Sequence, residues 1–340
     1  MKKACFAVLP FYQNNRVFDL TSEIYNRDNC AVPFAMLRDK FAQRGYDLST
    51  QDINGVNESE CVIYLDMPKT LPETTSVAKS FLLIYETDVI APKNWDMNKH
   101  KLFRKIFTWN DSMIDRQKYF KMNWSYVLPQ EIEYLPENKT KFCCLIAGNK
   151  SSRHELELYS ARVEAIRWFE KHHSELFDLF GIGWNEIQLP GNRFFESYKL
   201  LKLVKNFLSL FADKYPSYRG KIKHKLQTLR QYKFSICYEN ARDIPGYITE
   251  KIFDCLFAGC IPVYWGCNNI TEHIPADCFI DKRKFSSYQQ LFEYMSGMTD
   301  EAYAKYINST QNFLRNAAAR QFSAEYFAEI VTNEVFATLA

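Results

Sequence analysis

The sequence predicts an α/β protein of two domains, each built on a mostly parallel sheet. The chain has 340 residues, and at roughly 150 residues per domain this length favours two domains over one. Short apolar runs alternate with charged, helix-like segments, which is the pattern of stacked strand–helix units. The sequence becomes polar near residues 129–141, and the alternation then begins again. We therefore expect one domain on either side of this stretch.

The first domain is expected to contain several buried strands, because its apolar runs are short and lie between polar segments. These runs are residues 4–10, 61–65, 81–85, 105–109 and 125–128. None approaches the 18 or so apolar residues that a membrane-spanning helix needs, and the first is too short for the core of a signal peptide. We accordingly expect a cytoplasmic protein.

In the second domain, the apolar run 142–147 predicts a strand. A long amphipathic segment, 153–172, follows it with apolar residues spaced three or four apart, which predicts a helix with Ser151 or Ser152 as its N-cap.

A strand–helix–strand unit is predicted further on. Residues 232–238 and 261–265 have the composition of buried strands, and 248–258 has that of an amphipathic helix followed by Gly259. Ligands of open α/β sheets bind outside the carboxyl ends of the strands. The loop 239–246 and the first helical turn should therefore line a binding site, with the free N–H groups of the helix pointing at an anion such as a pyrophosphate.

The side chains at this helix start suit a sugar nucleotide. A carboxylate such as Glu250 can accept hydrogen bonds from the hydroxyls of a ribose, and an ammonium such as Lys251 can neutralise phosphates. Taken singly, each has a simpler interpretation: Glu250 complements the helix dipole and Lys251 is solvated.

The order of short motifs along the chain resembles the donor-binding signature of the family 10 glycosyltransferases, the α-1,3/1,4-fucosyltransferases. The resemblance covers about residues 140–290. It rests on residues 232–234, 238–240, 246–251 and 261–263 with Gly266, and on 142–150, 160–163 and 279–281.

This resemblance implies the GT-B fold, in which two Rossmann-like domains face one cleft. An acceptor-binding domain would span residues 1–136 and a donor-binding domain 137–317, with a closing helix at 318–340 that packs back on the first domain. The implied reaction is an inverting transfer of L-fucose from GDP-fucose to a glycan hydroxyl, giving an α-1,3 or α-1,4 linkage without a metal or other cofactor.

By the same resemblance, Arg162, Tyr247 and Lys251 would hold the diphosphate. Glu250 would bind the ribose hydroxyls, and Asn240 would lie beside the sugar or phosphate. The full set of expected donor-binding residues is Arg162, Glu239, Asn240, Tyr247, Thr249, Glu250 and Lys251.

Glu86 is the expected general base. It follows the apolar run 81–85 and so stands where an α/β sheet delivers catalytic groups, and it aligns with a glutamate of the family's first domain. Partial burial would raise its pKa towards the working pH. Two other interpretations are open: an exposed acid at a strand end, or an acid-x-acid metal site formed by Glu86 and Asp88.

The overall charge argues against a nucleic-acid partner. Lys and Arg number 43 against 40 Asp and Glu, a net charge of +3, far from the basic excess of a nucleic-acid binder. Residues 201–230 nevertheless carry eight basic residues and one acidic residue. This segment is either a solvated helix face or a surface that attracts phosphates or an anionic membrane.

The expected setting is the synthesis of a surface polysaccharide or lipopolysaccharide, or protein glycosylation, at the inner face of a membrane. The acceptor would be a glycan, with a lipid-linked glycan among the options. Two alternatives for the activity are another GDP-hexose donor and a non-catalytic sugar-nucleotide binder of the same fold. A Rossmann oxidoreductase is disfavoured because no complete glycine fingerprint occurs.

Overall fold

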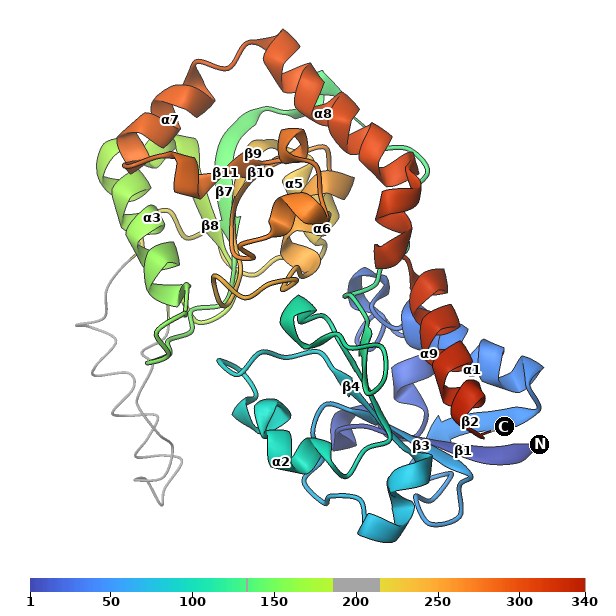
Figure 1. Cartoon of the computed structure of the whole chain (residues 1–340). Helices are drawn as coiled ribbons and strands as arrows, with labels where there is room; N and C mark the ends of the chain where they lie inside the picture. Colours follow the sequence, from blue (N-terminus) through green and yellow to red (C-terminus); the bar gives the residue numbers. More distant parts are fainter. Residues whose placement is uncertain (133, 186–214, 340) are drawn as a thin grey trace.

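The chain forms two lobes, each a parallel sheet covered by helices (Figure 1). The computed structural model describes residues 1–132, 134–185 and 215–339. The two α/β domains that the sequence predicts are therefore present.

The first sheet has the strand order β2-β1-β3-β4-β5-β6, and every neighbouring pair is parallel. Strand β4 lies inside it with all five residues buried, as the continuous apolar run predicts. The elements of this lobe are β1 Lys2–Ala7, α1 Val32–Gln43, β2 Tyr46–Thr50, β3 Cys61–Leu65, β4 Ser80–Ile84, α2 Met97–His100, β5 Lys105–Thr108 and β6 Tyr119–Lys121.

The prediction of a strand at residues 125–128 is wrong. Strand β6 is one of the two edge strands of the first sheet, and the chain after it crosses between the lobes. There the N–H of Tyr126 donates to the carbonyl of Phe322 (2.8 Å) and the N–H of Ala324 donates to the carbonyl of Tyr126 (2.9 Å). The apolar side chains of this crossing segment pack at the junction between the domains. A short apolar run at such a junction has the same local pattern as a buried strand.

The second sheet has the order β11-β10-β9-β7-β8 and is also parallel. Helices α5 and α6 share one hydrophobic cluster, and α3, α7 and α8 share another. The elements are β7 Lys141–Ile146, α3 Tyr159–His172, β8 Phe177–Phe180, α5 Lys225–Leu229, β9 Tyr232–Tyr238, α6 Glu250–Phe257, β10 Ile261–Trp265, β11 Ile280–Asp281, α7 Tyr288–Ser296 and α8 Asp300–Arg315.

Helix α3 begins later than predicted, and neither Ser151 nor Ser152 caps it. The Glu157 carboxylate instead accepts a hydrogen bond from the N–H of Tyr159 (2.6 Å). The residues before it are held in a loop, because the N–H of Leu158 donates to the carbonyl of Asn240 (3.1 Å). A non-local contact with the chain after β9 therefore replaces the first turns of the expected helix.

The last helix, α9 (Ala324–Leu339), returns to the first lobe (Figure 1). Its buried residues Phe327, Val331 and Val335 belong to the same hydrophobic cluster as Leu37 and Phe41 of α1. Both chain ends consequently lie on the first lobe. Within the described ranges, no helix is both long and apolar enough to cross a membrane.

The basic segment 201–230 is described only from residue 215 onward. In that part, Arg219 forms an ion pair with Asp178 (2.6 Å) and Lys225 with Asp254 (2.9 Å). Lys221 and Lys223 are exposed. Attraction of anions by this segment stays a prediction.

Candidate active site

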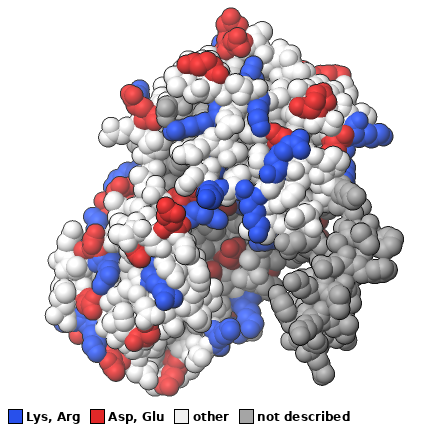
Figure 2. Space-filling view, turned by 180° about the vertical axis from the view of Figure 1, so that it is seen from behind, with Lys and Arg blue, Asp and Glu red and all other residues white. Residues whose placement is uncertain are grey.

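The candidate site lies where the two sheets end. Glu86 follows β4 by two residues and Glu239 follows β9 directly. Between the lobes one face of the molecule is hollowed, and Lys and Arg side chains gather on the upper side of this hollow (Figure 2). The site thus draws its residues from loops at the carboxyl ends of parallel strands, as predicted.

Glu239 is a buried residue that holds neighbouring residues of the candidate site in place. Its side chain is fully buried, and its carboxylate accepts hydrogen bonds from the N–H (2.8 Å) and hydroxyl (2.6 Å) of Thr249 and from Lys251 Nζ (3.2 Å). Thr249 is also buried. Both residues are buried and fix the start of α6 and the position of Lys251, and their expected contact with the donor stays a prediction.

Lys251 and Glu250 are the accessible charges of this turn. The exposed fraction of the side chain is 34% for Glu250 and 19% for Lys251, against none for Glu239. Burial alone would raise the pKa of Glu250, but Lys251 and Lys225 lower that pKa to about 2. Burial would conversely lower the pKa of Lys251, but Glu239 and Glu250 raise it above its ordinary value. The turn therefore presents an ammonium and a carboxylate that are both ionised at neutral pH.

Arg162 reaches the same loop from α3. It is buried, and its Nη2 donates to the carbonyls of Tyr238 and Glu239 (both 2.7 Å) and to Asn240 Oδ1 (3.0 Å). Its Nε and Nη1 make no hydrogen bond with any residue that the structure describes. The guanidinium thus anchors the end of β9 with one nitrogen and retains two further donor groups.

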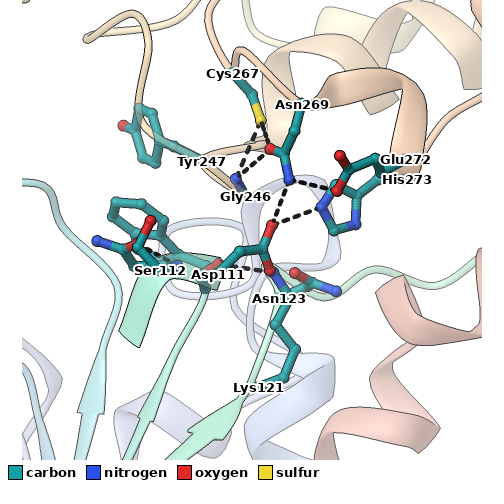
Figure 3. Close-up of polar contacts among 12 residues, drawn as sticks. Asp111, Ser112, Lys121, Asn123, Gly246, Tyr247, Cys267, Asn269, Glu272 and His273 are labelled. Carbon is teal, nitrogen blue, oxygen red and sulfur yellow. Dashed lines mark hydrogen bonds and ion pairs between the residues drawn. The ribbon is translucent and has the colours of Figure 1, made fainter. Parts of the chain in front are cut away.

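Tyr247 lies at the boundary between the domains (Figure 3). It is buried, and its ring packs on that of Trp109 with the ring centroids 4.7 Å apart. Its hydroxyl accepts a hydrogen bond from Asn240 Nδ2 at 3.4 Å. Tyr247 thus packs against the other domain, and its expected contact with the diphosphate stays a prediction.

Glu86 faces these groups from the first domain. Its side chain is partly buried, and no described residue donates a hydrogen bond to its carboxylate. Burial and the negative charge of Asp66 raise the pKa of Glu86 to about 7, while Lys251 acts to lower it. The structure therefore brings Glu86 and the charges of α6 into one electrostatic environment, although they lie about half the chain apart.

Asp66 is a supporting residue that our reading of the sequence missed. Its Oδ1 accepts hydrogen bonds from the N–H groups of Tyr85 (2.8 Å) and Glu86 (3.3 Å), and from Asn94 Nδ2 (2.7 Å). It fixes the backbone from which the Glu86 side chain projects. The signal that would have found it is the one that found Glu86, an acid placed directly after a buried strand.

Asp88 takes part in a contact between the domains. His154 Nδ1 accepts a hydrogen bond from the N–H of Leu156 (3.2 Å), so the ring proton lies on Nε2, which donates to Asp88 Oδ2 (3.1 Å). Of the two carboxylates in the acid-x-acid pair, that of Asp88 thus accepts a hydrogen bond from His154 of the second domain.

Tyr159 is a second residue that the sequence did not indicate. Its hydroxyl is buried and makes no hydrogen bond to a described residue, and the guanidinium of Arg162 lies over its ring at 5.1 Å. Lys251 and Glu86 both influence its pKa, which burial raises. This phenol is therefore a buried polar group next to Arg162.

Comparison with known sequences gives the family. A sequence model described as "Glycosyltransferase family 10 (fucosyltransferase) C-term" matches residues 136–330, more than half of the chain. The chain belongs to glycosyltransferase family 10. This confirms the resemblance on which the site residues were chosen.

Two curated fucosyltransferases are similar to part of this chain. The α-(1,3)-fucosyltransferase FucT of Helicobacter pylori is 28% identical over 123 residues, which are 33% of this chain and 25% of that protein. An α-(1,4)-fucosyltransferase of Arabidopsis thaliana is 32% identical over 104 residues, or 29% of this chain and 26% of that protein. The matched part thus spans about a quarter of the length of these relatives.

Solved structures extend the similarity to the whole fold. The crystal structure of an α1,3-fucosyltransferase with GDP has a TM-score of 0.58 at 15% identity and covers 99% of this chain and 90% of that chain. An α-glucosyltransferase in complex with UDP and DNA has a TM-score of 0.56 at 11% identity, covering 99% and 100%. The expected GT-B fold, with two Rossmann-like domains, is confirmed.

The raised pKa of Glu86 predicts a pH-dependent effect on stability. The carboxyl group titrates near 4.5 when unfolded and near 7 when folded, so its contribution to stability is lost as the pH rises through this window. Glu86→Gln removes this titration. The free energy of unfolding of Glu86→Gln minus that of the wild type should therefore be about 1–3 kcal/mol larger at pH 8 than at pH 4.5.

Denaturant unfolding at the two pH values measures this difference. Glu73→Gln is the matched control, because Glu73 is an exposed acid of the same domain, and its effect should stay within about 0.5 kcal/mol at both pH values. An effect of Glu86→Gln that is the same at pH 4.5 and pH 8 would contradict the raised pKa.

Proposed function

We propose that this chain is an inverting fucosyltransferase that moves L-fucose from GDP-fucose to a hydroxyl of a glycan, forming an α-1,3 or α-1,4 linkage. The observation that carries the proposal is that Glu86, a carboxyl of the first domain whose pKa lies near 7, is within electrostatic reach of Lys251 and Glu250 of the second domain. Family membership over residues 136–330, and relatives named as fucosyltransferases, support the choice of donor.

The donor would bind to the second domain. Lys251, the N-terminus of α6, and the Nε and Nη1 of Arg162 would neutralise the diphosphate of GDP-fucose. Glu250, ionised and accessible, would accept hydrogen bonds from the ribose hydroxyls. Buried Glu239 would keep Lys251 in place for this task.

Glu86 would act as the general base. As the acceptor oxygen attacks the anomeric carbon of fucose, its proton passes to the Glu86 carboxylate, the new C–O bond forms, and the bond from that carbon to the GDP oxygen breaks. GDP leaves with the electron pair of that bond, and the positive groups around its diphosphate stabilise the developing charge. A base whose pKa lies near the working pH suits this proton transfer.

We propose further that the acceptor is a surface polysaccharide, lipopolysaccharide or lipid-linked glycan, met in the cytoplasm at the inner face of a membrane. Lys221 and Lys223, which belong to the basic segment 201–230, are exposed and support contact with an anionic surface.

Replacement of the base tests the mechanism. Glu86→Gln should lower the rate of fucosyl transfer about 100- to 10,000-fold, because the amide cannot take the acceptor proton. Its affinity for GDP should change by less than about 1 kcal/mol in isothermal titration, and Glu73→Gln should transfer at the wild-type rate. Unchanged transfer by Glu86→Gln would remove Glu86 from the role, and a wild type that binds GDP-fucose but transfers nothing would favour the non-catalytic alternative.

The identity of the donor follows from a titration series. Residues 241–245, next to the expected sugar position, leave another GDP-hexose as the alternative donor, and structural neighbours of this fold bind UDP. We expect GDP-fucose to bind more tightly than GDP-mannose or UDP-glucose in isothermal titration. Tighter binding of GDP-mannose would overturn the fucose assignment.

Metal removal tests the role of the cationic residues. Since Lys251 and Arg162 would offset the diphosphate charge, the transfer rate should be the same in excess EDTA as without it. Loss of activity in EDTA that Mn²⁺ restores would instead support the acid-x-acid alternative at Glu86 and Asp88.

A further inference from the structure

Asp111 connects the two domains beside the candidate site (Figure 3). From the first domain, Lys121 Nζ donates to its Oδ1 at 2.6 Å. From the second, Asn269 Nδ2 and His273 Nε2 lie 2.9 Å and 2.8 Å from its Oδ2. We call these four residues the Asp111 cluster.

The cluster holds the loop that leads into α6. The N–H of Asp111 donates to the carbonyl of Pro245 (3.2 Å), and Asn269 Oδ1 accepts a hydrogen bond from the N–H of Gly246 (2.9 Å). Gly246 has a φ of +79°, and a Cβ atom there would lie 2.2 Å from the carbonyl oxygen of Trp109. Only glycine fits this approach, so the loop is pressed directly against the first domain.

The same segment reaches the backbone next to Glu86. Trp109 Nε1 donates to the carbonyl of Tyr85 (2.8 Å), and Lys121 Nζ donates to the carbonyl of Trp109 (2.7 Å). The Trp109 ring packs on Tyr247, three residues before α6 begins. Residues 109–111 therefore link the strand end that carries Glu86 to the turn that carries Glu250 and Lys251.

The hydrogen bonds around the Asp111 carboxylate stabilise its ionised form. Burial alone would raise the pKa of Asp111, but hydrogen bonds from His273, Asn269 and Lys121 hold that pKa well below its usual range. Charge-assisted hydrogen bonds of this kind are stronger and more directional than neutral ones. The contact is therefore suited to fix one domain relative to the other.

We propose that Asp111 is a positioning residue for the transfer reaction: its contacts with Asn269 and His273 set the distance between Glu86 and the N-terminus of α6. The inference rests on the proposed function, because it assigns the base to one domain and the donor to the other. The contacts of Glu239 with Lys251 and of Arg162 with Asn240 lie within the second domain and do not involve Asp111. Loss of the Asp111 contact should thus slow chemistry more than it weakens donor binding.

Asp111→Asn tests this with little change in volume, since the new amide cannot accept from Lys121, Asn269 and His273 together. We expect kcat to fall about 10- to 100-fold, because small displacements of reacting groups cost this much, while the KM for GDP-fucose stays within about threefold. Hydrogen exchange at residues 243–249 should become faster. His273→Ala, which removes one donor from the opposite domain, should change kcat and exchange in the same direction.

Glu334→Gln is the matched control. Glu334 pairs with Lys105 of β5 at 2.7 Å, and its side chain is 26% exposed, as is that of Asp111, but the pair lies between β5 and α9. This variant should keep the wild-type kcat and the wild-type exchange at residues 243–249. If Glu334→Gln lowered kcat as much as Asp111→Asn does, the effect of Asp111→Asn would reflect a general loss of stability, and the proposal would be overturned.

The remaining outcomes separate the inference from the proposed function. If the wild type transfers fucose and both Asp111→Asn and His273→Ala have the wild-type kcat, the positioning role is overturned but the proposed function is not. A kcat that is unchanged while the donor KM rises more than about tenfold also overturns it, because Asp111 would then serve donor binding. A wild type that transfers no fucose from GDP-fucose to any acceptor overturns the proposed function and the inference with it.

Discussion

Glu239 leaves the end of β9 with its whole carboxylate buried, and the neighbouring residues are arranged to satisfy that charge. An unpaired buried carboxylate is very costly, so the start of α6 must lie where Thr249 and Lys251 can donate to it. This fixes the ammonium of Lys251 beside the buried carboxylate, with 19% of its side chain exposed. The same contacts also determine the position of Glu250, the most accessible carboxylate of the turn, because Glu250 is the first residue of α6.

The two carboxyl groups that border the cleft are tuned in opposite directions. Glu86 lies next to Asp66 and is partly desolvated, and its pKa rises to about 7. Glu250 lies between Lys251 and Lys225, and its pKa falls to about 2. Such separation suits two tasks at one pH: a carboxyl that exchanges a proton and a carboxylate that only accepts hydrogen bonds.

Because these groups belong to different domains, their distance depends on how the lobes are joined. Helix α9 anchors the end of the chain on the first lobe through Phe327 and Val331. The Asp111 cluster and the contact of Asp88 with His154 join the lobes beside the cleft itself. In the single displacement that we propose, the acceptor oxygen must lie opposite the leaving GDP oxygen and within reach of the base. The geometry of these junctions would therefore affect the reaction.

Most of the strands and helices, the family signature and the strand-end position of Glu86 could be predicted from the sequence, because continuous apolar runs, helical periodicity and Gly259 are local signals. The tertiary fold determines which residues of the donor motif are exposed: Glu239, Tyr247 and Thr249 are buried, whereas Glu250 and Lys251 are partly exposed. It also decided where α3 begins and which residues join the domains. Asp111 lies 158 and 162 residues from Asn269 and His273, and contacts at such separation leave no periodic trace, since periodicity reports only how each element faces its own core.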